Sequence, residues 1–416
     1  MYRSVPDPSL RVLAIVHSPT FQGPHNTTST VARLLEPEGV HVTMLLPEDG
    51  PEAAERIQAM GVEVVTMPLH RARARPDPRL QAEYFGSLRR EVDAIAAVIR
   101  EREIDVVDTN TLPNLHGGLA ARKTGAALVW EIIDTFPPPA MRLAYMPFVL
   151  GMSDVVMTTG VKVAAGHPGV QRLGDRWVTY FPCVDVERFT ADPATRAAAR
   201  VELGLPADAT VVGNVAVMSP MKGHRHFIRA AAELRRTHPD TRFVILGARV
   251  EDREDYYAEL DALAGSLGLR LGEDLVVVDP GSRVKDLAQA FDVFWMTSEP
   301  QSEGAPTVIG EAKALGLPVV TTDVGSCSEC VTEGVTGFVV PARDTAAIAA
   351  RTRRILDDPD LAARMGVAAR AEAFTDYDSP NGAAAHRLAF ERAAEHRRAR
   401  SRRWHEPRRR PYGARS

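Results

Sequence analysis

Short apolar runs rich in β-branched residues alternate along this chain with longer segments whose apolar residues recur every three or four positions. The first pattern predicts buried β-strands and the second predicts amphipathic helices. The predicted strands are 12–16, 40–46, 62–67, 106–109, 127–133, 155–158, 211–217, 243–246, 275–278, 293–296, 319–322 and 338–340. The predicted helices include 28–35, 88–102, 222–236, 255–267, 307–315, 345–356 and 360–374. Strands separated by helices predict parallel sheets built from βαβ units.

The alternation stops once, in a polar, proline-bearing segment at residues 182–206, and then resumes. This interruption predicts two α/β domains, each a doubly wound parallel sheet, with a hinge near residues 189–193. We expect the domains at 1–187 and 188–375, a helix at 376–396 that crosses back to the first domain, and a basic, disordered tail at 397–416. Because ligands bind such sheets at the carboxyl ends of the strands, we expect the site in the cleft between the domains.

Charge and composition narrow the choice of partners. The 416 residues carry a net charge of −4, yet the last twenty hold nine Arg and one Glu, so the body of the chain is acidic. An acidic body argues against nucleic-acid binding. The apolar runs are far shorter than the roughly 18–20 residues of a membrane span, and the start of the chain lacks a signal-peptide pattern. We expect a cytoplasmic protein, with peripheral contact between the basic tail and acidic lipid at the inner membrane face left open.

Residues 302–311 carry the strongest chemical signal. Two carboxylates, Glu303 and Glu311, stand on either side of a Gly-Ala-Pro loop, and proline is favoured where a helix begins. The segment therefore predicts a loop that opens into a helix, with free backbone N–H groups and the positive end of the helix dipole at its mouth. Glu311 would lie about 7–8 Å along the helix axis, at roughly 1.5 Å per residue. A sugar nucleotide, with hydroxyls at both ends and phosphate between them, suits this layout.

A second strand–loop–helix unit lies at residues 217–223 and contains Lys222. Lysine is scarce in this chain, with 5 Lys against 45 Arg. A lysine at this position is therefore more suggestive of a specific role than it would be in a lysine-rich chain. In such a loop an ammonium group can reach diphosphate oxygens as a point charge. A solvated lysine at an ordinary helix start is the alternative.

Together these motifs resemble the retaining glycosyltransferases of family 4. The resemblance covers roughly residues 11–374 and is stronger over the second domain. Its further matches are Val184-Asp185 with Phe189, Asp323-Val324-Gly325 followed by Glu329, and the run 333–340. It implies the GT-B fold, in which two Rossmann-like domains face each other across a cleft.

By this resemblance the second domain binds a nucleotide-diphosphate sugar and the first binds the acceptor. Glu303, which meets the transferred sugar, and Lys222, which holds the diphosphate, would be the catalytic residues. Glu311 would bind the ribose hydroxyls. The loop that supplies nearby amides consists of Gly304, Ala305, Pro306 and Thr307. The family generally needs no bound metal, and no cofactor besides the substrate is implied.

Two positions depart from the family pattern. Val217 stands where the family usually has an arginine that pairs with the diphosphate, and Ile133 stands where a histidine usually precedes Asp134. A missing arginine removes a bidentate phosphate contact, for which Arg249 and Arg283 are candidate replacements. If nothing replaces these groups, two alternatives stay open: a sugar-nucleotide-binding protein without transferase activity, or a sugar-nucleotide epimerase on the same scaffold.

The acceptor side gives weaker signals. The candidates are Gly23, Asn26, Thr27, Asn110 and Asp134, although Asn and Thr at a helix start equally suit capping. The resemblance implies a metal-independent, retaining glycosyltransferase that moves a sugar to a hydroxyl, or less commonly to an amine or thiol, of a small-molecule or lipid acceptor, and the abundance of Ala and Arg indicates a bacterial source. The Cys327–Cys330 spacing has no second Cys or His pair to support zinc, so buried thiols are expected there.

Overall fold

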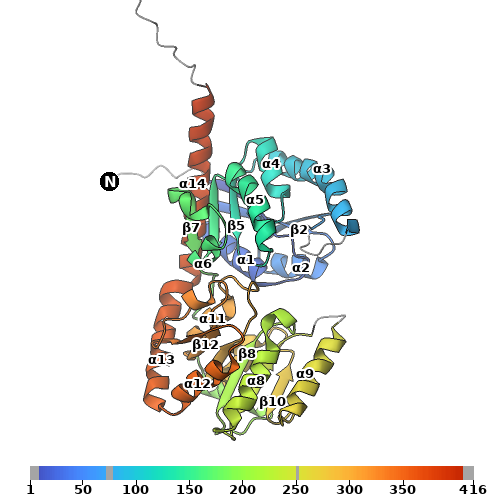
Figure 1. The fold of residues 1–416 in the computed structure, drawn as a ribbon. Coiled ribbons are helices and arrows are strands. Elements are labelled where there is room, and N and C mark those ends of the chain that lie inside the picture. The colour runs from blue at the N-terminus through green and yellow to red at the C-terminus, as the bar shows by residue number, and fades with distance from the viewer. Residues whose placement is uncertain (1–8, 72–77, 250–252, 406–416) are drawn as a thin grey trace, which may run out of the picture.

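Two separate parallel β-sheets organise the chain in the computed structural model, which describes residues 9–71, 78–249 and 253–405 (Figure 1). The first sheet has the strand order β3-β2-β1-β4-β5-β6-β7 and the second the order β10-β9-β8-β11-β12-β13. All paired strands within each sheet are parallel. Two doubly wound α/β domains are therefore confirmed.

Every predicted strand is present, and one strand that was not predicted, β7, closes the edge of the first sheet. The strands are β1 Leu10–Ile15, β2 Val40–Pro47, β3 Glu63–Met67, β4 Val106–Asn110, β5 Ala127–Ile132, β6 Val155–Thr159, β7 Trp177–Tyr180, β8 Val211–Val215, β9 Arg242–Leu246, β10 Leu275–Val278, β11 Val293–Met296, β12 Val319–Thr322 and β13 Gly337–Val340.

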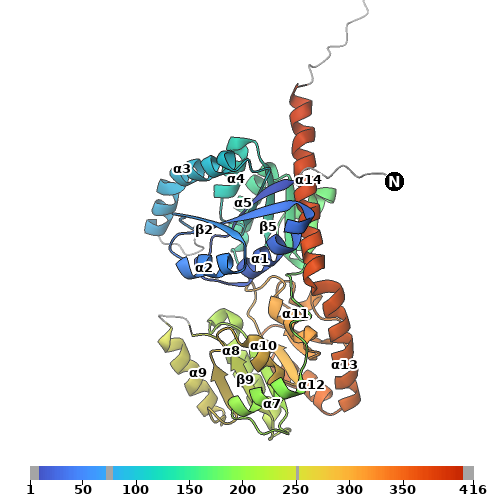
Figure 2. The same cartoon turned by 180° about the vertical axis from the view of Figure 1, so that it is seen from behind.

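Helices connect the strands and cover both faces of each sheet (Figures 1 and 2). The α-helices are α1 Gly23–Leu35, α2 Pro51–Ala59, α3 Pro78–Glu101, α4 His116–Thr124, α5 Pro139–Met152, α6 Val161–Ala165, α7 Pro193–Glu202, α8 His224–Arg235, α9 Glu254–Ser266, α10 Val284–Leu287, α11 Thr307–Ala314, α12 Thr345–Leu356, α13 Pro359–Glu372 and α14 Ser379–His405. Short 3₁₀ turns are η1 Glu36–Glu38, η2 Val170–Arg172, η3 Gly174–Arg176, η4 Pro220–Lys222, η5 Ala288–Ala290 and η6 Cys327–Glu329, and η7 Ala373–Tyr377 is a π-helix.

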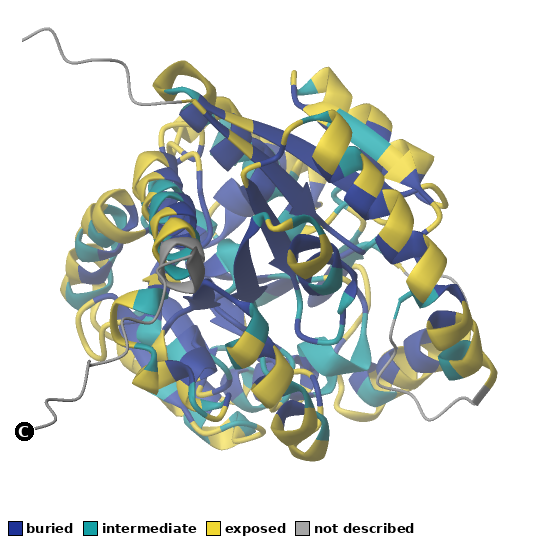
Figure 3. Ribbon diagram, turned by 90° about the horizontal axis from the view of Figure 1, so that it is seen from above, coloured by how far each residue is buried: buried dark blue, intermediate teal, exposed yellow. Residues whose placement is uncertain are grey.

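Each sheet separates two hydrophobic cores, as the period-two alternation of strand side chains requires. Along β1, Val12 and Ala14 pack with α1 and α14, whereas Leu13 and Ile15 pack with α3 and α4 on the opposite face. The buried strands fill the centre of the molecule, and the outer faces of the helices are exposed (Figure 3). Within the described ranges, no helix combines the length and apolar character needed to cross a membrane.

The chain crosses between the domains earlier than predicted. Cys183 still packs in the first domain, whereas Val184 and Phe189 lie in the core of the second. The predicted hinge at 189–193 is therefore wrong, and Pro193 begins helix α7 of the second domain instead. At the crossing, the N–H of Val184 donates to the carbonyl of Tyr377 (2.8 Å), so the outgoing and returning chain segments are paired.

The last helix, α14, returns to the first domain and extends beyond it (Figures 1 and 2). Ala383, Ala389 and Phe390 of this helix are buried in the core that also contains β1 and β5 residues. The predicted disorder from residue 397 is wrong up to His405, because the helix continues to that residue. The remaining tail, 406–416, lies outside the described residues.

Candidate active site

The loops at the carboxyl ends of the two sheets contact each other at the domain boundary, and we call this boundary, where Gly23 and Ile133 face Gly304 and Thr307, the interdomain crevice. A Cβ atom at Gly304, in the second domain, would lie 1.7 Å from the carbonyl oxygen of Ile133 in the first. A Cβ atom at Gly23, the first residue of α1, would lie 3.7 Å from Thr307 Oγ1, at the start of α11. The loops after β1 and β5 thus lie directly against residues 303–307. This is the predicted location of the site.

Lys222 and Glu303 form an ion pair in this crevice. Lys222 Nζ lies 2.6 Å from Glu303 Oε1, and Ser298 Oγ donates to the same oxygen at 2.7 Å. Glu303 is buried, and the Lys222 side chain is 25% exposed. Gly223 holds the turn that aims Lys222: its φ is 68°, and a Cβ there would lie 1.9 Å from the carbonyl oxygen of Thr297. The structure therefore brings together the two residues predicted to be catalytic.

Asp134 faces this pair from the first domain, where it follows β5. Burial raises the pKa of Asp134, and the negative charge of Glu303 raises it further. The N–H of Phe136, which donates to Asp134 Oδ1 at 2.9 Å, opposes this rise, as do the positive charges of Lys222 and Arg142. Charged groups of the second domain, Glu303 and Lys222, therefore act on Asp134 of the first domain across the domain boundary.

Helix α11 begins at Thr307, with Pro306 as its N-cap residue rather than its first helical residue. Gly304 and Ala305 form the loop before it, so the predicted loop that opens into a helix is present. Glu311 lies in the same helix. Desolvation raises the pKa of the Glu311 carboxyl to about 7, and the nearby positive charge of Arg188 opposes that rise.

Neither candidate replacement for the missing arginine adds its charge to the Lys222–Glu303 pair. Arg283 makes two bonds to Glu202, both of 2.6 Å, and Arg249 lies over the ring of Tyr257. The placement of Arg283 in the donor site is thus not supported by its contacts. Val217 is 46% exposed.

Arg142 is a residue near the crevice that sequence reasoning missed. It is buried, its Nη1 donates to the carbonyl of Gly166 (2.6 Å), and its Nε has no hydrogen-bond partner among the described residues. Its positive charge acts on Asp134 and opposes the burial-driven rise in the pKa of that carboxyl, so Arg142 is a first-domain cation close to a predicted acceptor residue. The available signal was an arginine in the first turn of α5, whose other residues carry no charge.

The predicted acceptor-side residues separate into two groups. Gly23 and Asn26 lie in the first turn of α1 at the crevice, whereas Thr27 is buried in that helix. The cap of α1 comes from Gln22 and His25, so capping by Asn26 or Thr27 is wrong. Asn110 is buried and its Nδ2 donates to a Glu131 oxygen at 2.7 Å. Its side-chain amide therefore bonds inside the first domain, which argues against a contact with the acceptor.

His17, which directly follows the first strand region, is a second residue that sequence reasoning did not single out. Its ring is 3% exposed, and both of its nitrogens lack a hydrogen-bond partner within the described part of the chain. Burial lowers the pKa of His17 well below its usual value, and the nearby His116 and Arg71 add to this effect. These effects favour the neutral imidazole, in which one ring nitrogen is a donor and the other an acceptor.

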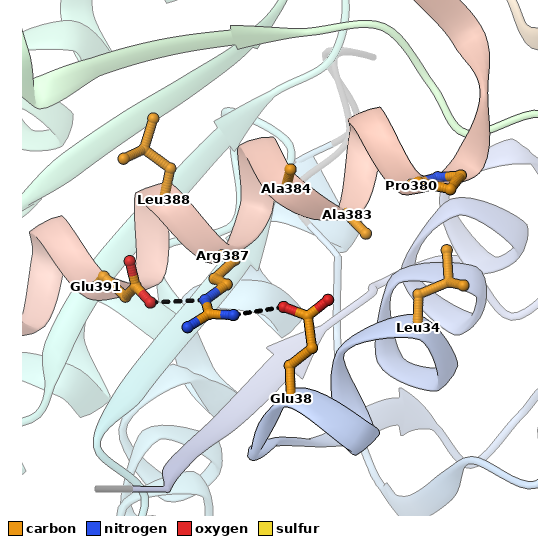
Figure 4. Close-up of a pocket in the computed structure, with 8 residues that line it drawn as sticks. All are labelled: Leu34, Glu38, Pro380, Ala383, Ala384, Arg387, Leu388 and Glu391. Atoms are coloured by element: carbon orange, nitrogen blue, oxygen red, sulfur yellow. Dashed lines mark hydrogen bonds and ion pairs between the residues drawn. The ribbon is translucent and has the colours of Figure 1, made fainter. Parts of the chain in front are cut away.

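Two other features, the cysteine pair and a surface groove, are weaker candidates for a functional site. Cys327 and Cys330 are buried free thiols, and burial raises the pKa of Cys330 to about 12. Among the residues that the structure describes, no His, Cys, Asp or Glu cluster could hold a metal ion. A groove of about 630 Å³ lies between α1 and α14, but its Arg387 is already paired with Glu38 and Glu391 (Figure 4).

Comparison with known proteins agrees with this geometry. Residues 22–214 match the family described as "Glycosyl transferase 4-like domain", and residues 195–372 match "Glycosyl transferases group 1". A glycosyltransferase from Rickettsia africae has a similar structure, with a TM-score of 0.76 and 18% identity over 92% of this chain and 98% of that chain. The Anabaena protein HepE, solved with UDP and glucose, gives 0.74 and 20% over 90% and 97%.

Curated relatives match over shorter segments. A Mycolicibacterium smegmatis GDP-mannose-dependent phosphatidylinositol monomannoside mannosyltransferase is 38% identical over 45% of this chain and 49% of its own length. A D-inositol 3-phosphate glycosyltransferase from Streptomyces avermitilis is 35% identical over 68% of this chain and 65% of its own. For the first relatives found, the chain spans about half of their length.

Two parallel α/β sheets of this topology are the fold of GT-B glycosyltransferases, and the family matches make this chain a glycosyltransferase. The chain belongs to glycosyltransferase family 4.

Proposed function

We propose that this protein transfers a sugar from a nucleotide-diphosphate sugar to a hydroxyl group, with retention of configuration at the anomeric carbon. The observation that carries the proposal is the 2.6 Å ion pair of Lys222 and Glu303, which faces Asp134 across the crevice. Retention is the stereochemistry that the family resemblance implies.

On the donor side, the diphosphate would lie between Lys222 and the amides of residues 304–307. Cleavage of the anomeric bond leaves negative charge on the departing phosphate, and preorganised donors aimed at that charge lower the barrier. Glu303 would then contact the transferred sugar. Glu311 would accept hydrogen bonds from the ribose hydroxyls. An arriving diphosphate would compete with Glu303 for the Lys222 ammonium, so donor binding would rearrange this pair.

On the acceptor side, His17 and Asp134 would contact the hydroxyl-bearing substrate. The imidazole of His17 is buried, and its two nitrogens have no hydrogen-bond partner among the residues that the structure describes, which favours a ligand that both donates and accepts hydrogen bonds, as a polyol does. Two relatives are named for inositol phosphate and phosphatidylinositol-derived acceptors. We therefore propose a cyclic polyol acceptor, either free and phosphorylated or carried on a lipid. Contact of the basic end of α14 with acidic lipid would suit the lipid-borne form.

Product analysis tests this proposal. The full-length protein would be incubated with GDP-mannose, UDP-sugars and dTDP-sugars, each with inositol 3-phosphate or with vesicles that contain phosphatidylinositol. Mass spectrometry should detect a glycosylated acceptor for one donor, and NMR should show retained anomeric configuration. Inverted configuration, or transfer that persists in both Lys222→Ala and Glu303→Ala, would contradict the proposal.

One observation favours a second candidate, a sugar-nucleotide-binding protein without transferase activity. Val217 leaves the crevice without the arginine usual in the family, and Arg249 and Arg283 are paired elsewhere. This candidate predicts nucleotide-sugar binding by calorimetry, with no transfer to any acceptor. Incubation of the donor alone, followed by a search for an epimer, separates both candidates from a sugar-nucleotide epimerase.

A further inference from the structure

The loop that follows β12, residues 323–330, binds the first turn of α6 across the domain boundary. The N–H groups of Val161 and Lys162 donate to the two carboxylate oxygens of Glu329, at 2.7 and 2.5 Å. The N–H of Val163 donates to Ser326 Oγ at 3.3 Å. The first N–H groups of a helix have no partner within the helix, so the second domain supplies the partners that α6 lacks.

Two further features fix this interdomain contact. Lys162 Nζ lies 2.6 Å from Asp323 Oδ1 and 2.5 Å from Ser328 Oγ. Gly160 has a φ of 90°, and a Cβ atom there would lie 2.4 Å from Ser326 Oγ. A side chain at position 160 would therefore hold the domains apart. Lys162 and Asp323 are both about half exposed, so salt screens their attraction and the amide bonds to Glu329 matter more.

The same loop supports the backbone of the candidate active site. The N–H of Ser326 donates to the carbonyl of Gly304 at 2.9 Å. A Cβ at Gly325 would lie 2.1 Å from the carbonyl oxygen of Glu303, so the two backbones are in close contact. Ser326 thus contacts α6 of the first domain through its hydroxyl and the loop of Glu303 through its amide. A single residue links the domain boundary to the site.

We propose that Glu329 and Ser326 are positioning residues, which couple closure of the two domains to the placement of Glu303 and Gly304. When the domains are closed, α6 holds the 323–330 loop, and that loop holds the backbone beside Glu303. When they separate, Glu329 loses its two amide donors and the loop loses its support. The kinetic consequence rests on the proposed function, whereas the effect on domain closure does not.

The substitution Glu329→Ala tests this coupling, with Glu333→Ala as the matched control. Glu333 lies in the segment that follows, but its carboxylate accepts from Val339 N (2.7 Å) within the second domain. Small-angle scattering of the full chain should show a larger radius of gyration for Glu329→Ala and no change for Glu333→Ala. We expect kcat to fall about 10- to 100-fold, as a small misplacement near the chemistry does, while nucleotide affinity changes less than about threefold.

Two outcomes would overturn the proposal: a wild-type scattering curve for Glu329→Ala, or a loss confined to nucleotide affinity. Glu329→Gln guards against simple unfolding, because its amide oxygen keeps an acceptor for these N–H groups. Its kcat should lie between those of the wild type and Glu329→Ala. A kcat as low as that of the alanine variant would contradict the proposal that hydrogen bonds from the α6 amides to residue 329 support the loop. If no variant transfers sugar, the proposed function fails, and the scattering comparison still decides the coupling.

Discussion

Glu303 accepts a hydrogen bond from Lys222 across 2.6 Å, and these two residues come from different βα loops of the second sheet. Lys222 follows β8 and Glu303 follows β11, which are neighbours in the sheet. Parallel neighbours bring their carboxyl ends to the same edge, so residues 81 positions apart meet there. The pair is also the point at which a donor phosphate and the transferred sugar would meet.

Replacement of Lys222 by Ala should reduce transfer about 10²- to 10³-fold, because it removes a preorganised cation from the developing phosphate charge. The variant should lose some stability, because Glu303 is buried and keeps Ser298 Oγ as a donor but not the ammonium, so activity is compared below the melting temperature of the variant. Steady-state kinetics with saturating donor measures the effect, and circular dichroism checks the fold. Lys285→Ala is the matched control, because Lys285 is a second-domain lysine paired only loosely with Asp286 at 3.5 Å. Equal losses in both variants would argue against a specific role for Lys222.

Replacement of Gly304 by Ala should strongly reduce transfer without preventing nucleotide binding. The new Cβ would lie 1.7 Å from the carbonyl oxygen of Ile133, so the domains must move apart to accommodate it. The nucleotide contacts proposed for the second domain remain. We expect kcat to fall by about 10²-fold or more, with nucleotide affinity by calorimetry nearly unchanged. Gly265→Ala in α9 is the control, because a Cβ there meets nothing within 4 Å. A fully active Gly304→Ala enzyme would mean that the domains need not approach this closely.

The secondary structure followed from the sequence because strand periodicity was strong and local. The strand that was missed, β7 Trp177–Tyr180, lies at the edge of the first sheet and has an exposed Thr179, so it lacks the continuous apolar run by which the other strands were predicted. Helix α14 was predicted too short for a different reason. Its last turns lack apolar periodicity, yet arginine and alanine are good helix formers and the helix continues to His405.

The site was predictable only in part. Glu303, Lys222 and Glu311 sit in loops or helix starts whose local sequence already suggests phosphate chemistry. His17 and Arg142 are notable because they are buried without full hydrogen bonding, and burial arises from packing that no local pattern reveals. Asn110 failed for the same reason: its amide contacts Glu131, which stands on a different strand. Tertiary packing therefore decided which polar residues face the crevice.

Replacement of Glu311 by Gln should stabilise the unliganded protein at alkaline pH. Desolvation raises the folded-state pKa of Glu311 to about 7, above its unfolded value near 4.5, so the folded state binds more protons between these values. The stability that this group contributes is therefore lost as pH rises from about 4.5 to about 7. At pH 8 the variant should gain at most about 3 kcal/mol, and below pH 4.5 the difference should vanish. Urea unfolding at both pH values measures the difference, and a destabilised variant at pH 8 would show that the carboxylate is favourably paired.

Replacement of His386 by Ala should destabilise the first domain strongly. His386 Nε2 lies 2.8 Å from Glu131 Oε1, and both side chains are 3% exposed. A buried histidine–glutamate pair therefore connects α14 to β5. Loss of the imidazole leaves the Glu131 carboxylate buried with one partner fewer, which costs about 3–5 kcal/mol. Thermal unfolding measures this loss. Arg392→Ala provides the comparison on the same helix, because its guanidinium donates an exposed hydrogen bond to the Asp175 carbonyl at 2.9 Å. Similar melting temperatures for the two variants would argue against the buried pair.

Replacement of His17 by Phe should separate stability from acceptor use. The two rings are similar in size, and phenylalanine removes two buried nitrogens that have no hydrogen-bond partner in the described part of the chain. A buried polar group without a partner costs about 1–3 kcal/mol, so the unliganded variant should melt at a higher temperature than the wild type. If His17 contacts the acceptor, the acceptor KM should rise at least about tenfold while donor affinity stays the same, because one lost hydrogen bond to a buried polar group is worth about that much. His41→Phe is the control, since His41 is exposed and paired with Glu36 at 2.8 Å. A variant that is less stable than the wild type, yet uses the acceptor normally, would assign His17 to the structure of the first domain rather than to acceptor binding.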